Sequence, residues 1–188
     1  MRKGLICLLC AVSALLYSCD DNFTPKPKAY LALEFPPHQY ERFNADCPYS
    51  FAVNTAAVVT SSFRHESCRF DIVYPKMDGT IYLTYEPVNG NLHQLLHDAQ
   101  QLPLQHTIKA DEIIGSKYSN AQHHTYGMLY TVTGNAASQT QFYLTDSVNH
   151  FITGSVYFRK EPNYDSIYPA AVYLKKDVEK LMESLQWQ

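Results

Sequence analysis

The stretch Tyr126-Gly127-Met128-Leu129-Tyr130-Thr131-Val132-Thr133 contains the pattern that decides the fold. Aromatic or apolar side chains stand at every second position from its first residue, which is the period of a β-strand with one buried face. The alternation continues in two later segments, Gln139–Thr145 and Phe151–Arg159. Turn-forming residues separate the three segments, at Gly134-Asn135 and at Asp146–Asn149. We therefore expect three consecutive antiparallel strands in this half of the chain.

Segments with the composition of strands also precede this region. They are short, aromatic or β-branched, and bounded by prolines or polar clusters: Ala29–Phe35, Tyr49–Val53 and Arg69–Tyr74. The turn Pro75–Gly79 should join the last of them to Thr80–Glu86 as a hairpin, because proline presets one φ angle and glycine accepts a positive one. The sheet is thus expected to be mainly antiparallel.

Helices are predicted on both sides of the three-strand region. Asn91 suits the N-cap of a first helix, and Pro103 should end it. Between them, apolar residues recur with the 3.6-residue period of a helix, at Leu92, Leu95, Leu96, Ala99 and Leu102. A short second helix is expected over Thr107–Ile114. The last helix has one apolar stripe, made of Ala171, Leu174, Val178, Leu181, Met182 and Leu185. This order predicts a single α+β domain over residues 29–188, in which helices flank the sheet, similar in fold to PsbP/Mog1-like α/β/α sandwiches.

The first nineteen residues have the features of an export signal. Arg2 and Lys3 precede the apolar run Leu5–Leu16, which as a helix would rise about 18 Å, too short for about 30 Å of hydrocarbon. The end of this run, Leu16-Tyr17-Ser18-Cys19, resembles the lipobox of bacterial lipoproteins. We predict a signal peptide over residues 1–18, lipidation at Cys19 and a proline-containing tether to residue 28, followed by the domain. Cleavage by ordinary signal peptidase, which would leave Cys19 a free thiol, is the alternative.

Charge and cysteine content limit the class of protein. When Arg2 and Lys3 leave with the signal, 15 basic residues become 13 against 18 acidic ones, so the net charge changes from −3 to −5. No basic block occurs, and nucleic-acid binding is therefore not expected. Cys47 and Cys68 are the only cysteines after Cys19, and we predict a disulfide between them in an oxidising compartment. A catalytic thiol is the alternative.

Several segments match a known family and occur in the same order along the chain. They include Cys47–Phe51, His106–Ala110, Tyr126–Tyr130, Gly134–Ser138, Gln141–Ser147, Gly154–Phe158, Pro162–Ser166 and Trp187. Together they resemble the gliding-motility lipoprotein GldD family of the Bacteroidota over nearly the whole mature chain. The resemblance implies an envelope lipoprotein that the gliding apparatus and the type IX secretion machinery need, directly or indirectly. From the anchor, the tether, this resemblance and the absence of a coherent catalytic set, we predict a non-enzymatic component that binds other proteins of that machinery. The resemblance provides no catalytic residues to carry over.

The eight histidines are the main features that favour an enzyme. His93 and His97 have a metal-binding spacing on a helix, but leucines occupy the buried face and no glutamate follows His93 as in H-E-x-x-H. We interpret them as exposed helix residues. His123 and His124 are expected to open a strand, where neighbouring side chains point to opposite faces and can hardly share one ion. We predict no catalytic residue, no cofactor and no metal site.

A periplasmic enzyme or a glycan-binding module is the alternative function. It would use the region of His106 and His150, or an exposed tyrosine surface from Tyr164 to Tyr173. Asp146, Ser147 and His150 resemble a catalytic triad only superficially, because one tight turn can hardly place nucleophile, base and orienting group in line.

Two further serines are candidates for modification. Asp146-Ser147-Val148 and Asp165-Ser166-Ile167 resemble the O-glycosylation signal of exported proteins in this phylum, which makes Ser147 and Ser166 possible acceptors. Asp-Ser pairs also suit turns and helix starts, because their side chains bond backbone N–H groups.

Overall fold

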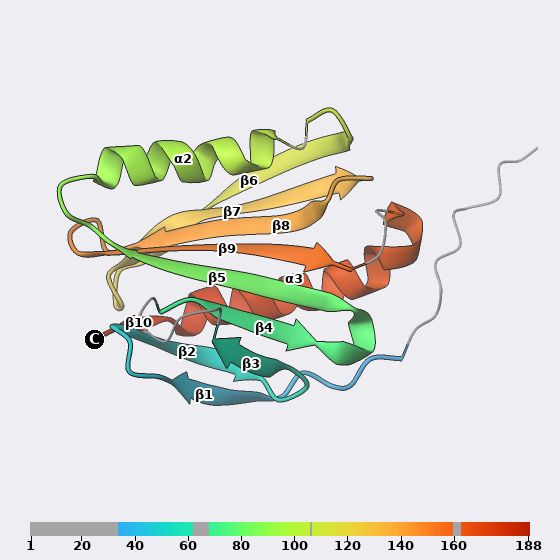
Figure 1. The fold of residues 1–188 in the computed structure, drawn as a ribbon, viewed down its shortest axis with the longest axis horizontal. Helices are drawn as coiled ribbons and strands as arrows, with labels where there is room; N and C mark the ends of the chain where they lie inside the picture. The colour runs from blue at the N-terminus through green and yellow to red at the C-terminus, as the bar shows by residue number, and fades with distance from the viewer. Residues whose placement is uncertain (1–33, 62–67, 106, 160–162) are drawn as a thin grey trace, which may run out of the picture.

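The computed structural model describes residues 34–61, 68–105, 107–159 and 163–188 (Figure 1). In chain order the elements are β1 (Tyr40–Asn44), β2 (Tyr49–Asn54), β3 (Val58–Ser61), β4 (Phe70–Tyr74), the 3-10 helix η2 (Pro75–Met77), β5 (Gly79–Pro87), α2 (Leu92–Leu104), β6 (Ala110–Asn120), β7 (Thr125–Gly134), β8 (Ser138–Thr145), β9 (His150–Phe158), α3 (Tyr164–Ser184) and β10 (Gln186–Trp187). The predicted α+β class is confirmed.

The strands form two antiparallel sheets. The larger sheet has the order β3-β4-β5-β9-β8-β7-β6, and the smaller has the order β1-β2-β10. The three consecutive strands predicted from the alternating sequence are β7, β8 and β9, each paired antiparallel with the next. The predicted hairpin is also present, because β4 pairs antiparallel with β5 across η2.

The protein has three layers. Helix α3 and the small sheet cover one face of the large sheet, and α2 covers the other (Figure 1). Side chains of β8 go alternately to the two faces: Phe142 and Leu144 join the core beneath α3, while Tyr143 packs with Ala99 of α2. All six residues of the predicted α3 stripe are buried. The layers therefore follow from a strand period of two and an amphipathic helix on each side.

Within the described residues, the first strand is β1, which begins at Tyr40 and not in the predicted segment. Of the expected strand over residues 29–35, residues 29–33 lie outside the described part, and Glu34 and Phe35 are not in a strand. The observed strand β1 pairs with β2 at the edge of the small sheet. Its centre, Glu41-Arg42, is exposed, so the sequence lacks the regular alternation by which a half-buried strand is recognised.

The predicted second helix is wrong. Residues 107–109 form turns, and the remainder of the predicted segment is the start of β6. Ten register pairs join β6 to β7, among them Ile113 with Val132 and Ile114 with Thr131. These β-branched neighbours suit a sheet, and pairing with β7 outweighs the weak helical pattern.

Two boundary predictions for α2 also need correction. The helix continues through Pro103 to Leu104, because proline is tolerated there at the cost of one helical hydrogen bond at the very end. Asn91 does occupy the N-cap position, but its side-chain oxygen accepts the N–H of Asn89, not one from the helix. Leu102 of the predicted buried face is exposed.

Gly79, at the end of the turn between β4 and β5, lies where α3 packs closely on the sheet. The positive φ angle expected at Gly79 is at Asp78, with a value of 50°. A Cβ atom on Gly79 would lie 2.8 Å from Leu174 Cδ2. A side chain at this position would therefore displace Leu174 of α3, which packs closely on the sheet here.

The predicted disulfide between Cys47 and Cys68 is present, with a Cα–Cα distance of 5.7 Å. Cys47 leads into β2 of the small sheet, and Cys68 leads into β4 of the large sheet. The bridge thus links the two sheets directly.

Candidate functional site

An open hollow is lined by residues of two turns and by the last three residues of the chain. Figure 1 shows these turns and the C-terminus at the same end of the molecule. The walls of the hollow come from the β6–β7 turn, from the β8–β9 turn with the start of β9, and from β10 with the residue after it. The volume is about 580 Å³, within the range of sites for small molecules. We call this site the terminal hollow.

Asp146 organises the β8–β9 turn on one side of the terminal hollow. Its Oδ1 atom accepts the backbone N–H groups of Val148, Asn149 and His150 at 2.8 to 2.9 Å. Partial burial by itself raises the pKa of Asp146, but these three hydrogen bonds lower it below the ordinary value of an aspartate. The turn therefore presents a fixed carboxylate charge at the wall of the hollow.

His150 is held on two sides at the start of β9. Its Nδ1 lies 3.0 Å from the hydroxyl oxygen of Tyr85. Its ring stacks on the indole of Trp187, with centroids 5.1 Å apart and planes inclined by 12°. Burial raises the pKa of the Tyr85 phenol, and the charge of Asp146 raises it further, so the phenol stays protonated at neutral pH. These two contacts hold the imidazole in place as a hydrogen-bonded part of the structure.

His123 and His124 lie in the β6–β7 turn, so the prediction that they open a strand is wrong. The strand begins only at Thr125. The Oδ1 atom of Asn120 accepts the N–H of His123 at 3.2 Å, and His124 has a φ of 50°, which closes the turn. The carbonyl oxygen of His124 accepts the indole N–H of Trp187 at 3.3 Å. The turn thus fixes the indole, and both histidines line the terminal hollow.

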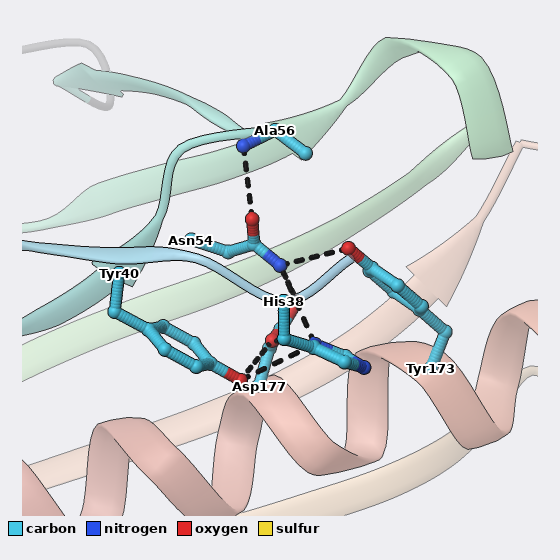
Figure 2. Close-up of polar contacts among 6 residues, drawn as sticks. All are labelled: His38, Tyr40, Asn54, Ala56, Tyr173 and Asp177. Carbon is cyan, nitrogen blue, oxygen red and sulfur yellow. Dashed lines mark hydrogen bonds and ion pairs between the residues drawn. The ribbon is translucent and has the colours of Figure 1, made fainter. Parts of the chain in front are cut away.

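A second polar cluster lies inside the protein, where α3 meets the first strands (Figure 2). At its centre is Asp177, only 3 % exposed. Its Oδ1 accepts the hydroxyl of Tyr40 at 2.7 Å and lies 2.8 Å from Nδ1 of His38, while Oδ2 accepts the amide of Asn54 at 2.9 Å. The same amide donates to the hydroxyl of Tyr173 at 2.9 Å. We call these five residues the Asp177 cluster.

The Asp177 cluster is structural, because its hydrogen bonds connect α3 to other parts of the chain. Burial and then the hydrogen bond to Asp177 raise the pKa of Tyr40, which keeps its phenol a donor. A buried carboxylate with donors from the segment before β1, from β1 and from β2 ties α3 to three separate parts of the chain. Our sequence reasoning missed this cluster. The available signal was an aspartate between Leu174 and Val178, on the buried face of an amphipathic helix.

One known family matches the chain across both of these sites. The family is described as gliding motility lipoprotein GldD, and the match covers residues 20–187, which include every strand and helix of Figure 1. The chain belongs to this family. The resemblance predicted from the sequence is thereby confirmed, and membership of a lipoprotein family supports a membrane-anchored protein of the cell envelope. No curated protein matches the chain.

The GldD-family fold distributes the predicted site residues over several places. Cys19 and His106 lie outside the described residues. Ser147 and Ser166 are both exposed, Ser147 in the β8–β9 turn and Ser166 in the first turn of α3. Their glycosylation stays a prediction.

The tyrosine surface predicted from Tyr164 to Tyr173 is wrong. Tyr173 is buried in the Asp177 cluster, and its ring stacks on His38 with a centroid distance of 4.1 Å. Tyr164 and Tyr168 are half-buried against each other, with centroids 5.4 Å apart. The helical period places Tyr173 beside Leu174 on the core side of α3, so the run cannot form one exposed patch.

The histidines on α2 are exposed, as we predicted for His93 and His97. Nδ1 of His97 lies 3.4 Å from a carboxylate oxygen of its neighbour Asp98. Within residues 34–61, 68–105, 107–159 and 163–188, no group of three or more His, Cys, Asp or Glu side chains is arranged to hold a metal ion. In the same part of the chain, no helix has both the length and the apolar character needed to cross a bilayer.

Proposed function

We propose that this GldD-family protein is a lipid-anchored, non-enzymatic component of the gliding and type IX secretion machinery that binds another protein of that machinery. Cys19 would anchor it, and the folded domain would face the periplasm or the outer membrane. Family membership supports the link to gliding. The link to secretion, the partner and the absence of catalysis belong to this proposal.

The observation that carries the protein-binding role is the long edge strand β6. It has 11 residues, and its pairing in the described sheet is with β7 alone. Ile114 on this strand is 47 % exposed, and Ile108 just before it is 94 % exposed. An edge with free backbone groups and exposed apolar side chains suits the addition of an extended strand from a partner. We propose such a strand as the occupant.

Charged residues on β6 fit a specific partner better than self-association. Asp111, Glu112 and Lys117 are exposed along the strand, and the register shifts between Ala110 and Glu112. Charges and bulges are the usual protection of a sheet edge against pairing with a copy of itself. A partner strand with complementary charges would overcome this protection.

Substitution at the two opposite edges of the large sheet tests the proposal. Ile114→Lys places a charge on β6 and should abolish photo-cross-linking to a machinery protein in native membranes, and impair colony spreading and release of secretion substrates. Val58→Lys is the matched control, because Val58 is a 54 % exposed apolar residue on the opposite edge strand β3. Cys19→Ala should reproduce much of the loss. Normal spreading and secretion in a strain that lacks the gene would overturn the proposal.

A binding module at the terminal hollow is the second candidate. The observation in its favour is that His123, His124 and His150, which are distant in sequence, line one concave site. A hydrolase of the triad type is less well supported, because the carboxylate of Asp146 accepts the backbone N–H of His150 and not its imidazole. The hollow is therefore better suited to binding a ligand than to this chemistry.

A further inference from the structure

We propose that the terminal hollow binds a neutral saccharide. This inference rests on the second candidate function, since it names the ligand class of that site. It is independent of the partner strand proposed for β6.

The first argument is the aromatic wall. The rings of His150 and Trp187, which both line the hollow, stack on each other with planes inclined by 12°, so a ligand can pack only on an outer face or an edge of this pair. Tyr85 holds the imidazole through Nδ1 at 3.0 Å, and the carbonyl of His124 holds the indole N–H at 3.3 Å. A sugar ring presents an apolar face of C–H groups that packs on such flat aromatic surfaces. Because both rings are fixed by hydrogen bonds in the free protein, little conformational entropy is lost on binding.

The second argument is the amide content of the other walls. Four amide side chains line the hollow, and all four residues are exposed: Gln122, Asn149, Gln186 and Gln188. Each amide has both a donor and an acceptor group. Oε1 of Gln186 already accepts from Arg42, and Nε2 of Gln188 donates to Oδ1 of Asn44 at 3.2 Å, so the amides of Gln122 and Asn149 are the ones that can offer both groups to a ligand. Sugar hydroxyls also donate and accept at once, so neighbouring hydroxyls can bond to one amide in pairs. Aromatic and amide groups together match the two kinds of surface that a sugar carries.

The third argument is charge. Among the described residues that line the hollow, Asp146 is the only acidic one, and none is Lys or Arg. A phosphate, a sulfate or a uronic acid would meet this carboxylate with no permanent cation beside it, because the only cationisable side chains in the lining are the three imidazoles. A neutral sugar avoids this repulsion, and its hydroxyls can donate to the carboxylate. The lining therefore selects uncharged saccharides over anionic ones.

The test uses the single tryptophan of the chain, which lines the hollow. The full chain is purified in a detergent without a sugar headgroup, because a glycosidic detergent would compete for the site. Cellotetraose, maltotetraose and chitotetraose serve as neutral probes, and tetragalacturonate serves as the anionic one. At least one neutral probe should change the Trp187 emission saturably and release heat in calorimetry, while tetragalacturonate should bind at least about tenfold more weakly.

Two variants establish where the probe binds. Trp187→Leu should weaken the calorimetric affinity at least about tenfold. Trp187 also packs against the core, so Asn149→Ala, at an exposed residue, is the second variant and should weaken binding without loss of stability. Tyr82→Leu is the control, because Tyr82 is an exposed aromatic residue outside the hollow.

Three outcomes would overturn the inference: no response to any neutral probe, tighter binding of tetragalacturonate, or binding that survives both variants at the hollow. None of them bears on cross-linking at β6 or on spreading. Failure of the saccharide site is therefore distinguishable from failure of the proposed protein-binding role.

Discussion

At the scale of single residues, the least expected feature is the carboxylate of Asp177 within the apolar contacts of α3. Hydrogen-bond partners of this carboxylate come from outside the helix. Oδ1 contacts Tyr40 and His38, and Oδ2 contacts Asn54. A charge in such a place destabilises the protein unless these donors compensate it. Removing the carboxylate would in turn leave buried donors without an acceptor.

We therefore predict that Asp177→Ala lowers the free energy of unfolding by about 3 kcal/mol, measured by urea denaturation of the purified protein. Glu179→Ala on the exposed side of the same helix is the control and should change stability by less than about 0.5 kcal/mol. Equal effects of the two substitutions would show that the cluster does not stabilise the protein. The sequence predicted the helix and its stripe, but a buried aspartate is recognised only when its partners in Figure 2 are known.

At the scale of elements, strands were predictable where the sequence alternates or is rich in aromatic and β-branched residues, and the exposed edge strands β1 and β6 were not. The strands β7, β8 and β9 follow from the segment that begins at Tyr126, and α3 follows from its stripe. Strand β6 was missed because it is an exposed edge, where burial imposes no period on the side chains. The terminal hollow was missed because three segments far apart in sequence form its walls. His123, His124, Asp146 and His150 were each considered from the sequence, but the sequence did not indicate that they share one site.

Glycine positions within the sheet provide the prediction at this scale. A Cβ on Gly127 of β7 would lie 1.9 Å from the backbone oxygen of Tyr143, so β7 and β8 would have to separate. On the edge strand β6, a Cβ on Gly115 meets only side chains, the nearest being Cε of Met128 at 3.1 Å. Gly127→Ala should lower the unfolding free energy by about 3 kcal/mol, and Gly115→Ala by clearly less, in thermal or urea denaturation. A smaller effect at Gly127 than at Gly115 would contradict the observed register.

At the scale of the whole molecule, the small sheet could move away from the large one if packing alone held them together. Besides the shared core, two specific links join them near Cys68: its disulfide with Cys47, and its carbonyl oxygen, which accepts the hydroxyl of Tyr49 at 2.7 Å. Burial raises the pKa of Tyr49, so this hydroxyl stays protonated and donates throughout the neutral range. Of the two links, only the disulfide is covalent. It joins two cysteines that are 21 residues apart in the sequence.

A closed loop of this length stabilises a protein by about 3 kcal/mol, a large part of the 5–15 kcal/mol typical of a domain. We therefore expect the double variant Cys47→Ala, Cys68→Ala to unfold at a lower urea concentration than the parent protein. A reductant should lower the midpoint of the parent and leave that of the variant unchanged, because only the parent has this bridge to lose. Tyr49→Phe removes the hydrogen bond but keeps the disulfide, and should retain the response to reductant. If the reductant affected parent and double variant equally, the bridge would not be what holds the two sheets together.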